Sequence, residues 1–217
     1  MAADTKPGGA DRGDTPVFKT RDPAAPQFWD ERFAQGYTPW DQHGVPAIFA
    51  ACAQAMPRGA VLIPGCGSAH EAGWLAQHGY TVTAIDFSAA AIEAARAQLV
   101  NVPNGGSVDL QQADFFTFEP RERPRWIYER AFLCALPPGK RRDYARRMAQ
   151  LADPGCLLTG LFFLGDTGKK GPPFGIDDAE LDALLSADFE RVDTRDVGDS
   201  LPAFAGRERW LSWRRRG

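Results

Sequence analysis

The sequence has little of what disulfide-bonded, metal-binding or membrane proteins require. It contains four cysteines and three histidines among 217 residues. Neither type forms a pattern such as C-x-x-C or H-E-x-x-H, so we expect buried reduced thiols and no metal. No apolar run approaches the roughly 20 residues of a membrane span, and the N-terminus lacks the basic and apolar segments of a secretory signal. These absences predict a soluble, cytoplasmic protein.

Positive charge is not in excess either. The chain has 25 Lys and Arg residues against 28 Asp and Glu residues, which gives a formal net charge of -3. Proteins that bind nucleic acids usually carry a concentrated basic excess that neutralises phosphates. We therefore expect the partner to be a small molecule rather than a nucleic acid or a membrane, and we expect a monomer.

The N-terminal residues, 1–25, contain almost nothing that a core could bury. They are rich in proline, glycine, aspartate and threonine, which predicts a disordered or loosely attached arm. The remaining residues, 26–217, have the length of one domain. That domain begins with an aromatic segment, 26–44, in which Trp29 and Phe33 lie at helical spacing before the string TPWDQ.

From residue 60 onward, short apolar runs alternate with helical patterns. Five apolar runs predict buried strands, and two further runs near the C-terminus predict an antiparallel pair. Strands separated by single helices form a parallel sheet, because a right-handed crossover places each helix on a face of that sheet. The sequence therefore predicts an α/β fold with a Rossmann-like sheet and helices on both faces. The expected strands are 60–64, 80–86, 108–114, 126–132, 156–164, 189–197 and 207–215.

Ligand-type residues follow three successive strands of this sheet. Gly65 and Gly67 come after the first strand, where missing side chains let a ligand approach backbone N–H groups. Asp86 ends the second strand and can accept hydrogen bonds from two ribose hydroxyls. Asp114 and Phe115 end the third strand, where an acceptor beside an aromatic ring suits an adenine. Each residue alone could be a turn, a helix cap or core, but together they predict a site for an adenosine-containing ligand.

The residue that follows the glycines decides between adenosine ligands. A dinucleotide site of the type G-x-G-x-x-G needs a third glycine, and His70 occupies that position. The chain also has no P-loop motif. S-adenosylmethionine, which carries an adenosine but no phosphate, fits better. A nicotinamide-dependent dehydrogenase and an inactive adenosine-binding module are the alternatives.

Five longer strings carry a more specific signal. They are FWDERFAQGYTPWDQ, LIPGCGSAHEAGWLAQHGYTVTAIDFS, ADFFTF, YERAFLCALPPGKRRDYA and GPPF, and they cover roughly residues 27–190. Together they resemble the thiopurine S-methyltransferase family, and most of all its branch of thiol, thiocyanate and halide methyltransferases. The resemblance implies a class I methyltransferase fold, with seven mostly parallel strands of which the last is antiparallel. It also implies S-adenosylmethionine as the cofactor and S-adenosylhomocysteine as the product.

The resemblance also implies which residues bind the cofactor. The contacts of the family fall on Trp29, Trp40, Gly65, Asp86, Asp114, Phe115 and Arg130. Plant members have a tryptophan where this chain has Phe33. They have a tyrosine where it has Arg130, which the thiopurine-type members share.

The aromatic segment is expected to form a lid. Trp29, Phe33 and Trp40 could simply pin residues 26–44 to the domain. However, aromatic faces also attract a sulfonium cation, by about 0.5 to 2 kcal/mol each. A lid built from them would also exclude water from the cofactor.

Arg130 is the candidate catalytic residue, because it could orient the acceptor. It could have a structural role alone, as the ion-pair partner of Glu129 or of a surface acid. At the end of the fourth strand, however, it could hold an anionic acceptor or favour the ionisation of a thiol, whose free pKa is about 8.5. The loop with Pro172, Pro173 and Phe174 is expected to border the same pocket.

In the predicted reaction, a small soft nucleophile attacks the methyl carbon of the sulfonium in line, and S-adenosylhomocysteine leaves. A thiol, sulfide, thiocyanate or a halide would be the acceptor. Aromatic thiols or selenium and tellurium compounds, as acceptors of a thiopurine-type enzyme, are the alternative.

Overall fold

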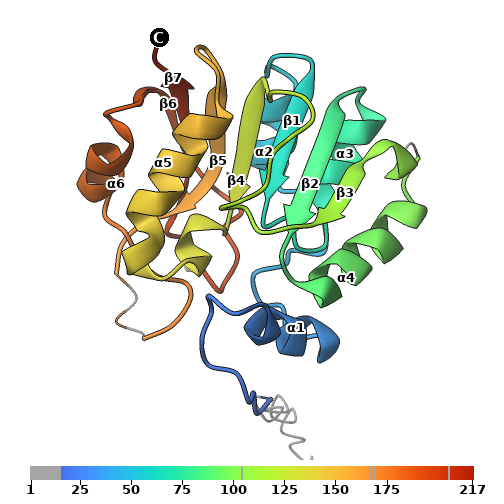
Figure 1. Ribbon diagram of the computed structural model, residues 1–217. Helices are drawn as coiled ribbons and strands as arrows, with labels where there is room; N and C mark the ends of the chain where they lie inside the picture. Colours follow the sequence, from blue (N-terminus) through green and yellow to red (C-terminus); the bar gives the residue numbers. More distant parts are fainter. Residues whose placement is uncertain (1–15, 104, 167, 169, 205) are drawn as a thin grey trace, which may run out of the picture.

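The computed structural model describes residues 16–217 apart from 104, 167, 169 and 205. Its sheet consists of β1 (Ala60–Pro64), β2 (Thr81–Asp86), β3 (Asp109–Gln112), β4 (Trp126–Arg130), β5 (Leu157–Phe163), β6 (Phe189–Asp196) and β7 (Glu208–Arg215). The seven strands lie in the order β3-β2-β1-β4-β5-β7-β6 (Figure 1). β1 to β5 pair in parallel, whereas β7 is antiparallel to both β5 and β6. The predicted seven-stranded, mostly parallel sheet with an antiparallel last strand is confirmed.

Helices cover both faces of this sheet, as predicted. One face carries α2 (Ala47–Ala53), α3 (His70–Gln77) and α4 (Ala89–Val100), and the other carries α5 (Arg141–Leu151) and α6 (Asp178–Leu185). Three short 3-10 helices, η1 (Gly105–Ser107), η2 (Leu133–Ala135) and η3 (Pro138–Lys140), lie in the connections.

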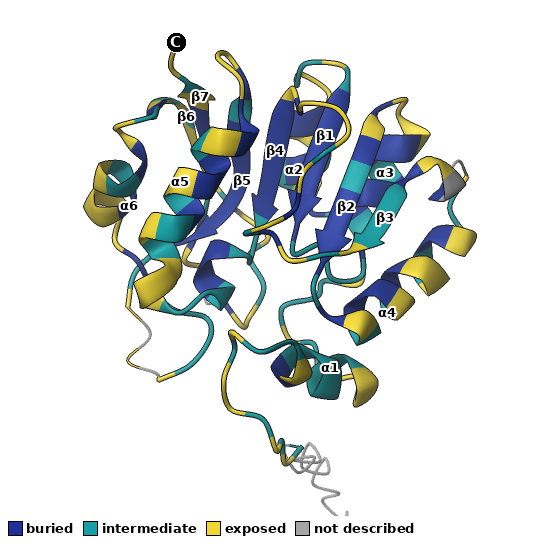
Figure 2. Cartoon of the chain, viewed as in Figure 1, coloured by how far each residue is buried: buried dark blue, intermediate teal, exposed yellow. Residues whose placement is uncertain are grey.

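The central strands separate two halves of the hydrophobic core. In β1, Val61 and Ile63 face the helices α2 to α4, whereas Leu62 between them faces α5 and α6. Because both sides of such a strand are covered, its sequence is apolar throughout rather than alternating. Figure 2 shows the same burial along β1, β4 and β5. The continuous apolar runs of the sequence are therefore the central strands.

Helix α1 (Pro26–Ala34) lies beyond the carboxyl ends of the parallel strands (Figure 1). The backbone N–H groups of Lys19 and Thr20 donate to Oε2 of Glu31 on this helix, at 2.9 and 3.0 Å. Specific contacts thus begin inside the stretch 1–25 that the composition predicts to be an arm. Residues 1–15 of that stretch lie outside the described part of the chain.

The cysteines are all free thiols, as predicted from their spacing. Three of them are buried and Cys66 is half-buried. Among the described residues, no helix is both long and apolar enough to cross a membrane.

Candidate functional site

A cavity of about 860 Å³ lies between the carboxyl edge of the sheet and α1. Its walls come from α1 and the loop after it, from the turn after β1, from the ends of β2 and β4, and from the loops after β3 and β5. Every residue that the sequence singles out for the site lines it, with one exception. The lining members are Trp29, Phe33, Trp40, Gly65, Gly67, Asp86, Asp114, Phe115, Arg130, Pro172 and Pro173.

The exception is Phe174, which does not line the cavity. Its backbone N–H donates to the carbonyl of Cys134 at 2.6 Å and so ties the GPPF loop to η2. Pro172 and Pro173 are the residues of this loop that face the cavity. Phe174 therefore supports the loop through its backbone.

The turn after β1 requires glycine. Gly65 and Gly67 have φ values of 60° and 52°, a region that side chains rarely allow. A Cβ atom on Gly65 would also collide with the ring of Phe132. The turn is fixed further by the N–H of Cys66, which donates to the carbonyl of Ile85 at 3.0 Å. The predicted glycine turn is therefore a rigid edge of the cavity.

Asp86 is the buried carboxylate of the site. Its oxygens accept hydrogen bonds from the N–H of Gly67 at 3.1 Å and the N–H of Ser88 at 2.9 Å. Burial raises the pKa of Asp86 to about 6, although these backbone N–H groups act in the opposite direction. A carboxylate has about four lone-pair positions, so Asp86 can accept further hydrogen bonds from a ligand in the cavity.

Asp114 and Phe115 follow β3 at the adjoining edge. Oδ1 of Asp114 accepts from the N–H of Phe116 at 2.9 Å, which closes a turn. The ring of Phe115 is buried and meets the ring of Phe132 edge to face, with 5.0 Å between their centroids. Both residues thus have structural partners and also line the cavity.

Three aromatic rings form the wall opposite the glycine turn. Trp40 meets Trp29 edge to face at 5.3 Å and Phe33 at 6.0 Å between ring centroids. The indole N–H of Trp29 donates to the carbonyl of Pro23 at 2.9 Å. The ring of Phe33 would lie only 3.6 Å from a Cβ atom on Gly67. We call Trp29, Phe33 and Trp40 the aromatic wall.

Helix α1 is attached to the rest of the molecule by Asp30, which the sequence did not single out. Oδ1 of Asp30 accepts from the hydroxyl of Ser88 at 2.7 Å and from the N–H of Ala90 at 3.1 Å. Ser88 also caps α4, because its hydroxyl oxygen accepts from the N–H of Ala91. The helix that carries the aromatic wall is therefore joined to the first turn of α4.

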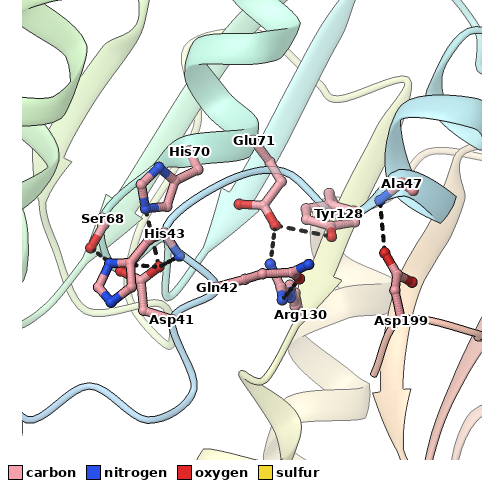
Figure 3. A network of polar contacts seen from close by, with 10 residues as sticks. All are labelled: Asp41, Gln42, His43, Ala47, Ser68, His70, Glu71, Tyr128, Arg130 and Asp199. Atoms are coloured by element: carbon pink, nitrogen blue, oxygen red, sulfur yellow. Dashed lines mark hydrogen bonds and ion pairs between the residues drawn. The ribbon is translucent and has the colours of Figure 1, made fainter. Parts of the chain in front are cut away.

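Arg130 is half-buried at the end of β4 and has two partners (Figure 3). Its Nη1 atom lies 2.8 Å from Oε1 of Glu71, and its Nη2 atom donates to Oε1 of Gln42 at 2.9 Å. Burial lowers the pKa of the guanidinium, but the charge and hydrogen bond of Glu71, together with weaker contributions from Tyr128 and Glu208, hold the pKa above its ordinary value. Glu71 and Gln42 were not predicted, because they come from α3 and from the loop before α2.

Glu129 is not the partner of Arg130. Its Oε1 atom accepts from the backbone N–H groups of Phe132 and Leu133, at 2.9 and 2.6 Å. Burial raises the pKa of Glu129 to about 7, against the effect of these two hydrogen bonds. Glu129 therefore fixes the turn after β4.

A second polar group lies beside Arg130 in Figure 3. Asp41 accepts from the hydroxyl of Ser68 at 2.6 Å and from the N–H of His43 at 2.7 Å, and it lies 3.1 Å from Nε2 of His70. Burial raises the pKa of Asp41, but the contacts with His70, Ser68 and His43 outweigh it, so the pKa lies well below its usual range. The contact with Asp41 in turn raises the pKa of His70. His70, which marks the departure from a dinucleotide motif, thus joins α3 to the loop after the aromatic wall.

Comparison with known proteins identifies the family. Residues 24–216 match the family model described as "Thiopurine S-methyltransferase (TPMT)". The chain belongs to the thiopurine S-methyltransferase family. The chain is 30% identical over 190 residues to "Probable thiol methyltransferase 2" of Arabidopsis thaliana, which covers 86% of this chain and 84% of that protein. It is 31% identical over 197 residues to "Thiopurine S-methyltransferase" of Bordetella parapertussis, which covers 82% of this chain and 90% of that protein.

The fold agrees with this membership. The chain resembles 1,6-didemethyltoxoflavin-N1-methyltransferase of Burkholderia thailandensis, which was solved with S-adenosylhomocysteine, with a TM-score of 0.71 and 18% sequence identity. The match covers 98% of this chain and 100% of that chain. This member of the thiopurine S-methyltransferase family is therefore an S-adenosylmethionine-dependent methyltransferase with the class I fold. The dehydrogenase considered from the sequence is not supported.

Proposed function

We propose that this methyltransferase acts on a small soft nucleophile, namely a thiol, sulfide, thiocyanate or a halide ion. The observation that carries the proposal is Arg130, a guanidinium that lines the same cavity as the buried carboxylate of Asp86. One group suits the hydroxyls of a nucleoside, and the other suits an anion. The names of two relatives, "Probable thiol methyltransferase 2" and "Thiocyanate methyltransferase 1" of Brassica oleracea, support the same acceptor class.

The cofactor end of the cavity fits S-adenosylmethionine. Among the described residues, Asp86 has no salt bridge to a cation, so its spare lone pairs suit uncharged hydroxyl donors such as those of a ribose. Asp114 and Phe115 would hold the adenine with an acceptor and an aromatic face. Gly65 and Gly67 leave room for the ligand close to the backbone.

The aromatic wall would contact the sulfonium. A cation placed against an aromatic face gains about 0.5 to 2 kcal/mol, and more where water is excluded. Trp29, Phe33 and Trp40 can provide both the faces and the exclusion of water, because they line the cavity from α1 and the loop after it. When bound, S-adenosylmethionine supplies an electrophilic methyl group for transfer to the acceptor, with S-adenosylhomocysteine as the leaving group.

Arg130 would hold the acceptor. A fixed guanidinium attracts thiocyanate, halide or thiolate, and it lowers the pKa of a nearby thiol. Pro172 and Pro173 would border the acceptor from the opposite loop. Because the acceptor anion neutralises the sulfonium, little proton transfer is needed. Proximity and orientation, worth about 7 to 11 kcal/mol in well-oriented systems, would supply most of the rate.

The bacterial relatives favour one further acceptor class. The chain is 31% identical to "Thiopurine S-methyltransferase" of Pseudomonas fluorescens, which covers 79% of this chain. Aromatic thiols are therefore the second candidate. We further propose that the chain is a cytoplasmic monomer and that nucleic acids are not acceptors, in line with its net charge of -3.

The proposal is tested by a transfer assay with S-adenosylmethionine labelled in its methyl group. Purified protein is supplied in turn with sulfide, an aliphatic thiol, thiocyanate, iodide and a thiopurine, and volatile products are collected. We expect labelled products from the small soft acceptors, with the thiopurine weaker. Transfer to the thiopurine alone would favour the second candidate, and no transfer to any of these acceptors would refute the proposal.

A further inference from the structure

Three potential metal ligands converge at the outer edge of the cavity. Asp41, His43 and His70 each place one ligand atom within 4.8 Å of the other two (Figure 3). Asp41 and His43 belong to the loop between α1 and α2, whereas His70 begins α3. The cluster thus joins two segments that are nearly thirty positions apart, which is why no spacing motif in the sequence indicated it.

The distances between these atoms suit a shared ion. Nε2 of His70 lies 3.1 Å from Oδ1 of Asp41, and Nδ1 of His43 lies 3.9 Å from the same oxygen. A tetrahedral ion with bonds of about 2.0 to 2.1 Å separates neighbouring ligand atoms by about 3.3 Å. Small side-chain adjustments would therefore bring all three atoms to bonding distance.

The polar atoms of the cluster face one another. Nε2 of His70 is buried, and Oδ1 of Asp41, at 3.1 Å, is the polar atom that it faces. A nitrogen and an oxygen ligand therefore already lie side by side. The hydroxyl of Ser68 donates to Oδ2, the other oxygen of Asp41, and so orients the carboxylate as an outer-shell partner does.

His43 is held beside Asp41 at a conformational cost. Its φ of 52° lies in the left-handed region, which a residue with a side chain adopts only when its surroundings require it. The side chain is 81% exposed. His43 would therefore be the metal ligand on the solvent side of the cluster, where a water molecule could serve as a further ligand.

We propose that Asp41, His43 and His70 form a binding site for a divalent transition metal ion, with Zn²⁺ as the preferred ion. Two imidazoles and one carboxylate suit Zn²⁺ and its neighbours better than Mg²⁺ or Ca²⁺, which prefer oxygen ligands. The ion would tie the loop after the aromatic wall to α3. Gln42, which contacts Arg130, lies between Asp41 and His43 in the sequence. Occupancy would therefore stiffen the segment that holds Arg130 in place.

The direct test is a titration of the full chain, freed of metal with a chelator, with Zn²⁺ in competition with a chromophoric chelator. We expect one saturable site, and we expect His43→Ala to weaken it at least about tenfold. His78→Ala is the matched control, because His78 is exposed and stacked on Trp74 outside the cluster. The absence of a saturable site, or equal affinity in His43→Ala and the wild type, would overturn the proposal.

Thermal unfolding gives a second readout without cofactor or acceptor. A ligand that binds only the folded state raises the melting temperature. Zn²⁺ should therefore stabilise the wild type and His78→Ala but not His43→Ala, whose exposed side chain is removed without loss of packing. Equal stabilisation of all three proteins would contradict the site. Neither measurement depends on methyl transfer, so failure here leaves the proposed acceptor class untouched.

Discussion

At the scale of single residues, the buried carboxylate of Asp86 is the proposed acceptor for the ribose hydroxyls. It sits at the carboxyl end of β2, where the sequence placed a ribose acceptor, and it is 9% exposed. Burial opposes ionisation, whereas a ribose with two hydroxyl donors would favour it. The position could be predicted because strand ends face ligands in such sheets. The raised pKa could not, since it depends on how closely α1 and the glycine turn enclose the carboxylate.

Binding of the product should therefore depend on pH through Asp86. Because the pKa of about 6 lies above the ordinary value of 3.8, the carboxylate becomes protonated as the pH falls through 6. It then loses the negative charge that strengthens its hydrogen bonds, and one of its oxygens becomes a donor. We expect the affinity for S-adenosylhomocysteine, measured by calorimetry, to fall about tenfold between pH 8 and pH 5. Asp86→Asn, which does not titrate, should lack this dependence, and an equal slope in both proteins would contradict the assignment.

Arg130→Ala should reduce the turnover of the acceptor more than the affinity for the cofactor. We expect kcat/KM for thiocyanate to fall about 10- to 100-fold, the scale of a hydrogen bond to a charged group. The affinity for S-adenosylhomocysteine, measured by calorimetry, should change less. Because the single variant leaves Glu71 without its 2.8 Å partner, the double variant with Glu71→Ala controls for an unpaired buried charge. Unchanged rates in both variants would remove Arg130 from the reaction.

Glu129→Gln should stabilise the protein at alkaline pH. The pKa of Glu129 rises from 4.5 to about 7 on folding, so the folded state binds this proton more tightly than the unfolded chain. The resulting stability is complete below pH 4.5 and is lost as the pH rises through 7. Glutamine keeps an Oε1 acceptor for Phe132 and Leu133 without the charge.

Urea unfolding measures the effect of this variant. At pH 8 we expect Glu129→Gln to exceed the wild type by roughly 1 to 3 kcal/mol in free energy of unfolding, and to show a smaller difference at pH 5. Glu190→Gln, at an exposed position, is the control. A variant less stable than the wild type at pH 8 would show that the charge of Glu129 is compensated.

At the scale of elements, α1 was predicted as a helix but its attachment was not. The spacing of Trp29 and Phe33 indicated the helix, and both rings face the cavity. Asp30 and Glu31 lie between them on the same helix and contact α4 and residues 19–20. Charged residues among aromatic ones do not indicate which distant backbone groups they will bind, so the sequence left the attachment open.

Asp30→Ala should loosen the attachment of α1 to α4. It removes the acceptor of two hydrogen bonds, from the hydroxyl of Ser88 and from the N–H of Ala90. A hydrogen bond to a charged group contributes about 1 kcal/mol or more. We expect weaker binding of S-adenosylhomocysteine, by about 3- to 30-fold, because the aromatic wall is carried by this helix. Glu93→Ala, on the exposed side of α4, is the control. Equal affinities would mean that α1 does not close the cofactor site.

At the scale of the whole molecule, the order of elements was predictable and the contacts between distant loops were not. Apolar runs and glycine breaks identified the strands, and the C-terminal pair was recognised as antiparallel. The position of β7 between β5 and β6 was not predicted from any residue. The contacts of Arg130 with Gln42 and of Asp41 with His70 join separate segments, and only the folded chain brings them together.

In our proposal, the cavity binds the methyl donor with its ribose on Asp86. Calorimetric titration of the purified wild type and Asp86→Ala with S-adenosylhomocysteine tests this binding. We expect one molecule to bind the wild type, and we expect Asp86→Ala to lose roughly 1.5 to 3 kcal/mol of binding free energy. Absence of binding to the wild type, or equal affinity in the two proteins, would contradict it.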